Sequence, residues 1–373
     1  KINAFSIIDE RSAAFFAMGI SLQTRKTTAI ACTSGSAALN YASAIAEAYY
    51  QKIPLLIITA DRPKYLIDVG DGQTIKQKNV FKNYIKKSYE LPENIDSPKR
   101  FEKAEKIINK ALEHCLYPEP GPVHINIPFD EPIYGTSNEE TSGRYFGCPI
   151  IKPKKDDEGI IKIIADEINK SSKVMIIAGQ NQPNEKLNST LTSLSKLNNL
   201  IILSETTSNI HDSLFIDTID NIISTFTDDD ALDFKPEILI SYGGQVVSKM
   251  IKKYLRKMKP KLHWHISRSG QNMDTYQCST KPIGTEPETF FKILLQNLIP
   301  SKSSYSKIWI NKKTVTTNLR IEYLDKIEYC DLKLVGFIMR KVKGGTTIHL
   351  GNSTPVRYSQ LFGSRNDITY QSN

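Results

Sequence analysis

The chain has 373 residues, of which 40% are apolar and 24% charged, and its formal net charge is +9. This length predicts two or three domains, and this composition is typical of a globular protein. No apolar run approaches the length of a membrane span, and no signal-peptide pattern is visible. The basic excess is mostly lysine without an aromatic-interleaved patch, which favours solvated faces over a nucleic-acid surface. A basic lining that binds anionic small molecules is also compatible with this charge.

Strand and helix patterns alternate through the first third of the chain. Residues 2–9 have the pattern of a strand that runs into a helix at three charged residues, Asp9, Glu10 and Arg11. Further strands are predicted at 27–33, 54–60 and 121–132, and helices at 36–51 and 99–115. The continuous apolar run 54–60 is typical of a strand buried on both faces. This order predicts a parallel sheet flanked by helices.

A polar stretch rich in Gly, Pro and Lys at 136–157 predicts a linker, and a second α/β unit follows it. Its expected elements are strands at 174–179, 200–205, 237–243 and 261–267 and a helix at 287–298. After a second linker at 300–304, helical patterns fill 305–342 and a last strand covers 346–353. We therefore expect an α/β fold of successive domains with parallel sheets flanked by helices.

The cysteines are odd in number and far apart: Cys32, Cys115, Cys148, Cys278 and Cys330. No pair has metal-ligand spacing, so we expect free thiols in a reducing cytosol. His263 and His265 alternate on a predicted strand. Because the sequence offers no third ligand beside them, it favours core or surface histidines over a metal site.

Cationic side chains follow several predicted strands, where parallel sheets bind their ligands. Arg62 comes just after the strand 54–60. It could clamp a carboxylate, or form a surface ion pair with Asp61 or Asp68. Lys249 follows another strand and two glycines, where an anion site and a solvated lysine both fit, and by itself the solvated lysine is favoured.

Small and hydroxyl side chains open two predicted helices. The segment 33–40, TSGSAALN, could let backbone N–H groups approach a ligand, or could simply start a helix. Ser353 and Arg357 lie one helical turn apart after the last strand. A hydroxyl and a guanidinium so placed suit a carboxylate ligand, and a helix cap beside a surface arginine fits about as well.

The triplet Gly70-Asp71-Gly72 invites interpretation as a metal–diphosphate motif. We reject that interpretation, because the triplet neither follows a buried strand nor precedes a pair of asparagines. The neighbouring Gln73, in a glycine-rich loop near Arg62 in sequence, is the better candidate for a functional residue.

The segments IIDERSAAFFAMG, CTSGSAALNYASAIAEAYYQKIPLLIITADRP, DVGDGQTIKQ and GPVHINIPFDEPIYG together resemble one enzyme family, and LGNSTPVR and YQSN resemble it again. This is the thiamine-diphosphate-dependent 2-succinyl-5-enolpyruvyl-6-hydroxy-3-cyclohexene-1-carboxylate synthase family of menaquinone biosynthesis. The combination of DER, TADRP with a downstream Gln, and GNSxxxR separates it from acetolactate-synthase-like relatives. The resemblance implies a pyrimidine-binding domain at 1–136, a central domain at 155–300 and the start of a diphosphate-binding domain at 301–373.

The implied activity is that of a transferase, which decarboxylates 2-oxoglutarate and adds the succinyl carbanion to isochorismate. Glu10 stands at the position that contacts the aminopyrimidine of the cofactor, where a carboxyl group exchanges a proton with the ring. The resemblance assigns a catalytic role to Glu10 and Gln73. It implies as substrate-binding residues Arg62, Gln73 and Lys249 for isochorismate, and Ser353 and Arg357 for the succinyl part.

The resemblance also implies Mg²⁺, with its binding segment outside this chain, and a cytoplasmic homodimer or homotetramer. The family's first strand and helix are missing, as is everything after YQSN, so we expect an internal piece of a longer protein, inactive by itself. Two alternatives stay open. One is a thiamine enzyme for another 2-oxo acid, and the other is a non-catalytic subunit or binding module of the same fold.

Overall fold

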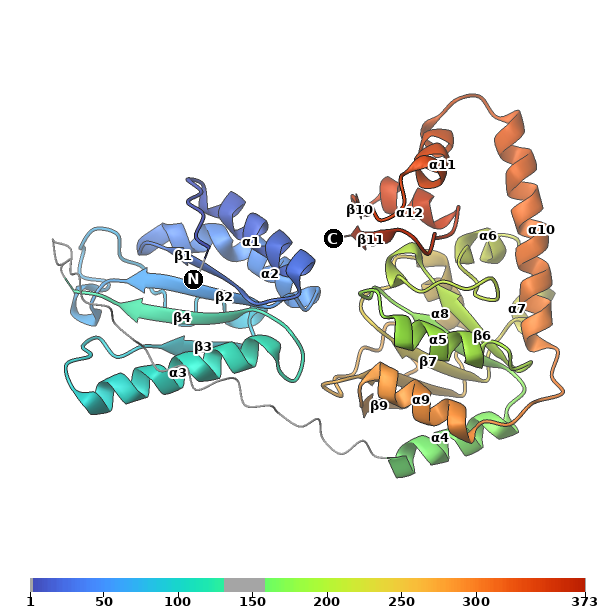
Figure 1. Ribbon diagram of the computed structural model, residues 1–373, viewed down its shortest axis with the longest axis horizontal. Helices are drawn as coiled ribbons and strands as arrows, with labels where there is room; N and C mark the ends of the chain where they lie inside the picture. Colours follow the sequence, from blue (N-terminus) through green and yellow to red (C-terminus); the bar gives the residue numbers. More distant parts are fainter. Residues whose placement is uncertain (1–2, 131–157, 373) are drawn as a thin grey trace. The chain divides into compact units, whose positions relative to one another are not determined.

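The computed structural model describes residues 3–130 and 158–372 (Figure 1). The chain divides into two compact units, Lys1–Lys152 and Pro153–Asn373. The predicted linker 136–157 and Cys148 lie outside the described residues. Of the helices in the two described ranges, none is both long and apolar enough to cross a membrane.

The first unit contains a parallel four-stranded sheet in the order β1-β2-β4-β3. Its strands are β1 (Thr28–Cys32), β2 (Leu55–Asp61), β3 (Lys87–Glu90) and β4 (Val123–Pro128). β2 and β4 are the central strands, which explains why their sequences are almost continuously apolar. The parallel sheet predicted for this part of the chain is confirmed.

Helices cover both faces of this sheet (Figure 1). The helical segments of the unit are α1 (Glu10–Thr24), η1 (Gly35–Tyr41), α2 (Ala42–Tyr50), η2 (Lys64–Leu66), η3 (Lys82–Tyr84) and α3 (Pro98–Leu116). α1 and α2 bury small side chains such as Ala14 and Ala48 against one face. α3 buries Ala104, Ala111 and Cys115 against the other. These three residues are seven and four positions apart, the spacing of one helical face.

Residues 3–9 do not form the strand that the sequence predicts over 2–9. The segment is extended, but it pairs with no strand among the described residues, and Phe5 and Ile8 are 67% and 101% exposed. An apolar pattern becomes a strand only when a neighbour completes its backbone hydrogen bonds. The sequence also missed β3, a short edge strand whose charged pattern, KSYE, carries little apolar signal.

The second unit is built on a parallel five-stranded sheet in the order β6-β5-β7-β8-β9. The strands are β5 (Val174–Ala178), β6 (Leu200–Ser204), β7 (Ile238–Tyr242), β8 (Leu262–Ser267) and β9 (Lys281–Gly284). β5 shows the two-residue period of a buried strand. Val174 and Ile176 join the core on one face, and Met175 and Ile177 join the core on the other.

Each face of this sheet has its own helical layer (Figure 1). One layer contains α4 (Glu158–Lys170), α5 (Glu185–Leu194) and α9 (Pro287–Asn297). The other contains α6 (Ile219–Ile223), α7 (Asp228–Asp233), α8 (Lys249–Met258) and the start of α10 (Tyr305–Lys326). A short turn, η4 (Thr206–Ser208), follows β6. The fold class predicted from the sequence, parallel sheets flanked by helices, is therefore confirmed in both units.

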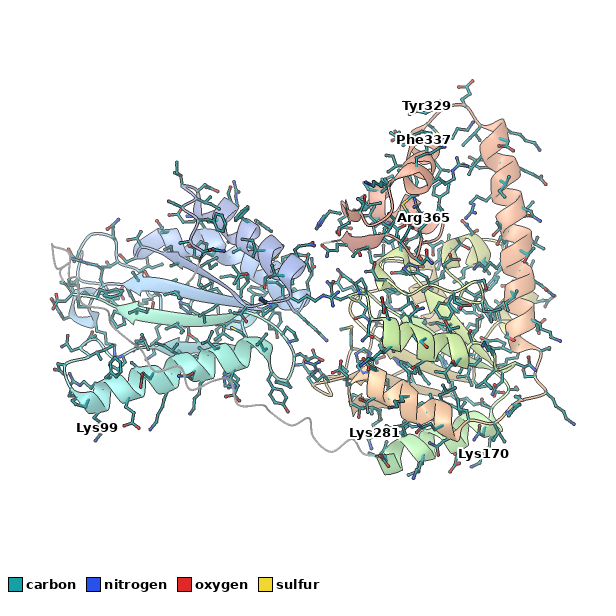
Figure 2. The ribbon with its side chains drawn as sticks, in the orientation of Figure 1. Lys99, Lys170, Lys281, Tyr329, Phe337 and Arg365 are labelled. Atoms are coloured by element: carbon teal, nitrogen blue, oxygen red, sulfur yellow. The ribbon has the colours of Figure 1, made fainter. Side chains whose placement is uncertain are left out.

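The last residues add α11 (Asp331–Lys341), β10 (Thr347–Leu350), α12 (Thr354–Gln360) and β11 (Thr369–Ser372) around a small core of their own. Arg365, labelled in Figure 2, donates to the backbone carbonyl of Val342 at 2.7 Å. The Asn209 side chain bonds both the N–H and the C=O of Tyr370 at 2.8 Å, which fastens β11 to η4. The domain boundary expected at residue 301 stays a prediction.

Candidate active site

The charged triplet at the start of α1 divides into a helix cap and a residue that faces a cavity. The backbone N–H of Ser12 donates to Asp9 Oδ1 at 2.8 Å, which caps the helix. Hydrogen bonds from Ser12 hold the pKa of Asp9 below its usual range. Glu10 is the first residue of α1 and lies close enough to Cys32, the last residue of β1, for their charges to interact. Glu10 therefore lies at the carboxyl edge of the sheet.

A cavity of about 610 Å³ lies beside Glu10, between α1, β1 and the extended residues 3–8. Its walls are mainly apolar and include Phe16 and Ile30. Burial raises the pKa of Cys32 to about 11, a hydrogen bond with Tyr41 opposes the shift, and the charge of Glu10 adds to it. A cavity with apolar walls and one carboxyl group is suited to a flat, weakly polar ring that exchanges a proton with that group.

Arg62 lies immediately after β2, at the same edge of the sheet. Its guanidinium contacts Asp71 Oδ2 at 3.3 Å, and its backbone N–H donates to Asp61 Oδ1 at 2.9 Å. Asp68, one of the partners expected from the sequence, instead pairs with Lys76 at 2.7 Å. The Arg62 side chain is 26% exposed, so part of it remains accessible to a ligand.

A buried network of polar side chains stabilises this edge of the sheet. Asn126 donates to Asp61 Oδ2 at 2.7 Å, and Thr59 donates to Asn126 Oδ1 at 2.9 Å. Gln77, which is fully buried, donates to the carbonyl of Ala60 at 2.8 Å and accepts from the backbone N–H of Gly35 at 2.7 Å. Burial raises the pKa of Asp61, and its bond from Asn126 opposes that shift. The network fixes the loops that follow β1 and β2.

Gln73 lies in the loop that passes over the start of η1. Gly35 has φ +81°, and a Cβ there would lie 3.1 Å from the backbone oxygen of Gln73. The backbones of the two loops therefore approach closely, and Gly35 permits this approach. Gln73 itself has φ +54° and an exposed side chain. The structure thus brings Glu10, the segment 33–40, Arg62 and Gln73 to one edge of the first sheet.

In the second unit a buried carboxylate organises the segment before Lys249. The backbone N–H groups of Val247 and Ser248 each donate to Glu205 at 2.7 Å. Burial raises the pKa of Glu205 to about 7, and the two N–H donors oppose this shift. Ser248 then caps α8 by accepting from the N–H of Ile251 at 3.1 Å. Lys249 is the exposed first residue of α8.

Basic residues gather near Lys249. Burial lowers the pKa of Lys252, the charge of Glu205 opposes this shift, and the charges of Arg256, Lys249 and Arg357 add to it. Burial raises the pKa of Asp220, which hydrogen-bonds Ser248, whereas the charge of Arg357 pulls it down. Lys249 and Arg357, which are over one hundred positions apart in sequence, thus both lie close enough to Lys252 for their charges to act on it.

Ser353 and Arg357 lie at the start of α12, as the sequence predicts. Arg357 donates its backbone N–H to the Ser353 carbonyl at 3.3 Å, and both side chains are exposed. Ser353 has φ 73° and ψ −123°, a conformation rarely found outside glycine. Ser353 is the N-cap residue of α12, and its side chain makes no capping hydrogen bond.

Residues 1–86 match the family model "Thiamine pyrophosphate enzyme, N-terminal TPP binding domain". This match includes Glu10, Arg62 and Gln73 and agrees with the α/β architecture of the first unit.

Several curated relatives carry the name 2-succinyl-5-enolpyruvyl-6-hydroxy-3-cyclohexene-1-carboxylate synthase. The chain is 39% identical over 366 residues to that of Flavobacterium psychrophilum, covering 98% of this chain and 64% of the relative. It is 34% identical over 374 residues to that of Desulfotalea psychrophila, covering 100% of this chain and 68% of the relative. The chain belongs to this synthase family. The resemblance identified from the sequence is therefore confirmed.

The chain spans less than two thirds of the Flavobacterium synthases, 64% of one and 63% of another. Within that span, the residues expected to serve a synthase lie in both compact units. Glu10, Arg62 and Gln73 belong to the first unit, and Lys249, Ser353 and Arg357 belong to the second. Their roles stay predictions.

Sequence reasoning missed two buried residues that organise the segments carrying candidate site residues, Gln77 in the first unit and Glu205 in the second. Gln77 lies four positions after Gln73, in a loop that carries no periodic signal. Glu205 directly follows the apolar strand β6, and a carboxylate in that position was a usable signal, because a buried charge needs specific partners.

Proposed function

We propose that this protein is a thiamine-diphosphate-dependent transferase. It decarboxylates 2-oxoglutarate and joins the succinyl unit to isochorismate. The product is 2-succinyl-5-enolpyruvyl-6-hydroxy-3-cyclohexene-1-carboxylate, an intermediate of the menaquinone pathway. Family membership over nearly the whole chain carries the proposal, and Glu10 lies at the carboxyl edge of its sheet, at one end of a cavity that runs along β1 and α1.

The residues around Glu10 fit the aminopyrimidine part of thiamine diphosphate. The ring would lie against the apolar wall that contains Phe16 and Ile30, and the Glu10 carboxyl group would hold or release a proton at a ring nitrogen. When bound, the cofactor supplies the nucleophilic carbon and stabilises the negative charge left when carbon dioxide departs.

Both substrates are dicarboxylates, so cationic and hydroxyl side chains must orient them. Arg62 can offer two parallel N–H donors to a carboxylate of isochorismate, and Gln73 and Lys249 add a donor each. Ser353 and Arg357, one helical turn apart, hold the distal carboxylate of 2-oxoglutarate. Mg²⁺ is proposed as the ion that accompanies the cofactor's diphosphate group.

We also propose the three-part division 1–136, 155–300 and 301–373 into pyrimidine-binding, central and diphosphate-binding domains, a cytoplasmic location, and assembly as a homodimer or homotetramer. The small core formed by residues from Met339 to Tyr370 supports a separate C-terminal part, whereas Tyr305 and Trp309 at the start of α10 belong to the core of the central sheet. Sedimentation of the purified protein tests the assembly.

The deciding experiment incubates the purified complete gene product with thiamine diphosphate, Mg²⁺, 2-oxoglutarate and isochorismate, and follows product by mass spectrometry. Glu10→Gln is expected to lower kcat about 10²- to 10⁴-fold, the usual loss for a group that transfers a proton. The matched control is Glu102→Gln, which removes an exposed carboxyl group on α3 that pairs with Lys106. It should leave kcat unchanged.

Other outcomes would contradict the proposal. Turnover with pyruvate in place of 2-oxoglutarate would indicate a different thiamine enzyme. Absence of turnover together with absence of any heat on titrating thiamine diphosphate and Mg²⁺ would indicate a binding module of the same fold. Equal activity of Glu10→Gln and the unsubstituted protein would remove Glu10 from its role.

A further inference from the structure

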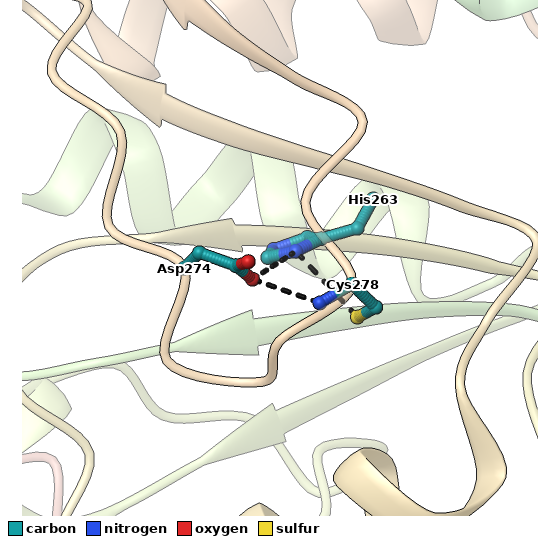
Figure 3. Close-up of side chains that lie close together, drawn as sticks. All are labelled: His263, Asp274 and Cys278. Carbon is teal, nitrogen blue, oxygen red and sulfur yellow. Dashed lines mark hydrogen bonds and ion pairs between the residues drawn. The ribbon is translucent and has the colours of Figure 1, made fainter.

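Three side chains with metal-ligating atoms lie close together in the second unit (Figure 3). They meet at the amino end of β8, away from the edge where Lys249 lies. His263 is the second residue of β8. Asp274 and Cys278 come from the connection between β8 and β9. The His263 Nδ1, an Asp274 carboxylate oxygen and the Cys278 Sγ all lie within 4.8 Å of one another. The sequence analysis singled out His263 but not Asp274 or Cys278 as its neighbours.

The separations suit an ion placed between the three atoms. His263 Nδ1 lies 3.9 Å from Asp274 Oδ1 and 3.8 Å from Cys278 Sγ. In a tetrahedral zinc site, bonds of about 2.0–2.3 Å place neighbouring ligand atoms about 3.3–3.6 Å apart. The observed distances exceed this by a few tenths of an ångström. The 3.9 Å between the imidazole and the carboxylate is too long for a direct hydrogen bond, whereas the 3.8 Å to Cys278 Sγ is within reach of a weak hydrogen bond to sulfur.

The surrounding hydrogen bonds present the correct atom of His263. Ser241 Oγ lies 2.8 Å from His263 Nε2 and 3.0 Å from His265 Nδ1. A hydroxyl donates only one hydrogen. When Ser241 donates to His265, it accepts from His263 Nε2–H, and the lone pair of His263 Nδ1 then faces Asp274 and Cys278. An outer partner of this kind is the usual support of a metal-bound histidine.

The loop that brings Cys278 to His263 is already formed. Asp274 Oδ1 accepts the backbone N–H groups of Cys278 and Ser279, each at 2.9 Å. The N–H of His263 donates to Thr280 Oγ1 at 2.9 Å, which closes the loop against the strand. His263 is fully buried, whereas the Asp274 side chain is 35% exposed, so an ion can enter from solvent and keep a water as its fourth ligand.

We propose that His263, Asp274 and Cys278 form a zinc site that fastens the β8–β9 connection to the sheet. A mixed nitrogen, sulfur and oxygen set favours Zn²⁺ over Mg²⁺ or Ca²⁺, which prefer oxygen ligands alone. The site lies at the opposite end of the strands from Lys249, so the ion would be separate from the residues expected to bind substrate. It is independent of the synthase activity.

The test uses untagged full-length protein stripped with a chelator and titrated with Zn²⁺ against a competing dye. We expect one tight ion per chain, a higher Tm with zinc, and protection of the Cys278 thiol from alkylation in peptide mass spectra. Exposed Cys330 is the internal reference and should remain reactive. With Co²⁺ in place of zinc, a sulfur-to-cobalt charge-transfer band reports the thiolate ligand directly.

Matched variants separate binding from folding. Cys278→Ser should abolish the cobalt band and weaken zinc binding at least about 100-fold, whereas Cys330→Ser should change neither. Ser241→Ala keeps all three ligands and should weaken binding about 10- to 100-fold through the loss of imidazole orientation. The proposal is wrong if Zn²⁺ binds Cys278→Ser as tightly as the unsubstituted protein, or if Co²⁺ binds without the band.

Discussion

The side-chain oxygen of Gln77 accepts a hydrogen bond from the backbone N–H of Gly35 at 2.7 Å, across 42 positions of sequence. The same amide donates to the carbonyl of Ala60 and, at 3.2 Å, to Asn126 Oδ1. One buried side chain therefore joins the loops that follow β1 and β2 to the neighbouring strand β4. These loops carry the candidate ligand-binding residues of the first unit.

Gln77→Leu is expected to lower the free energy of unfolding by about 2–4 kcal/mol, since each buried group left without a partner costs about 1–3 kcal/mol. Urea unfolding followed by circular dichroism measures the change. Gln73→Leu is the matched control, because the Gln73 side chain is exposed, and it should change stability by less than about 0.5 kcal/mol. If Gln73 orients isochorismate, this second variant loses activity while its stability is kept. Equal stabilities of the two variants would contradict the network.

Gly35→Ala should lower the free energy of unfolding by about 1–3 kcal/mol, because φ +81° is strained for an L-residue and the new Cβ meets the Gln73 backbone. Gly19→Ala, in the middle of α1, is the counterpart. A Cβ at Gly19 meets nothing within 4 Å, so the better helix propensity of alanine should stabilise the protein by about 1 kcal/mol. Thermal and urea melts of both variants test whether the two changes in the free energy of unfolding have opposite signs. Changes of the same sign would refute the argument.

Glu205 makes stability depend on pH. Its pKa rises from 4.5 to about 7 on folding, so the folded state binds this proton more tightly than the unfolded state does. The stabilising contribution of Glu205 to the free energy of unfolding is therefore complete below pH 4.5 and is lost as pH rises to about 7. The loss amounts to about 3 kcal/mol, at about 1.4 kcal/mol per pH unit.

Unfolding free energies between pH 4.5 and 8 check this effect. Other carboxyl groups contribute slopes of their own, so the informative quantity is the difference between the unsubstituted protein and Glu205→Gln. In the Glu205→Gln variant, the part of the decrease in unfolding free energy with rising pH that comes from Glu205 should be missing. Glu322→Gln, on the exposed side of α10, should keep it. Identical slopes in the Glu205→Gln variant and the unsubstituted protein would show that Glu205 does not titrate in this range.

Ser353 allows strain and ligand binding to be separated. Ser353→Gly relieves the backbone at φ 73° and should raise the free energy of unfolding by about 1 kcal/mol. Ser353→Ala keeps the strain and should leave stability within about 0.5 kcal/mol. Both variants lack the hydroxyl, so both should raise the KM for 2-oxoglutarate if that hydroxyl holds its carboxylate. A raised KM in the alanine variant alone would point to side-chain bulk instead.

The alternation of buried strands and helices was predictable because it depends on local periodicity. The run 54–60 became the central strand β2, and the run 174–179 became β5, which alternates between two cores. Residues 2–9 show the limit of the same rule. Their pattern is apolar, but a strand also needs a partner, and the described residues supply none.

The sequence by itself determined the fold class, the family and the position of Glu10 at the start of a helix, because each depends on residues that are adjacent or regularly spaced. Only the tertiary structure decided that Asp71 pairs with Arg62, that Gln77 supports Gly35, and that Lys249 and Arg357 both lie close to Lys252. It also brought Asp274 and Cys278 to His263. These contacts join loops through the packing of a whole sheet, and no local pattern records which loops will meet.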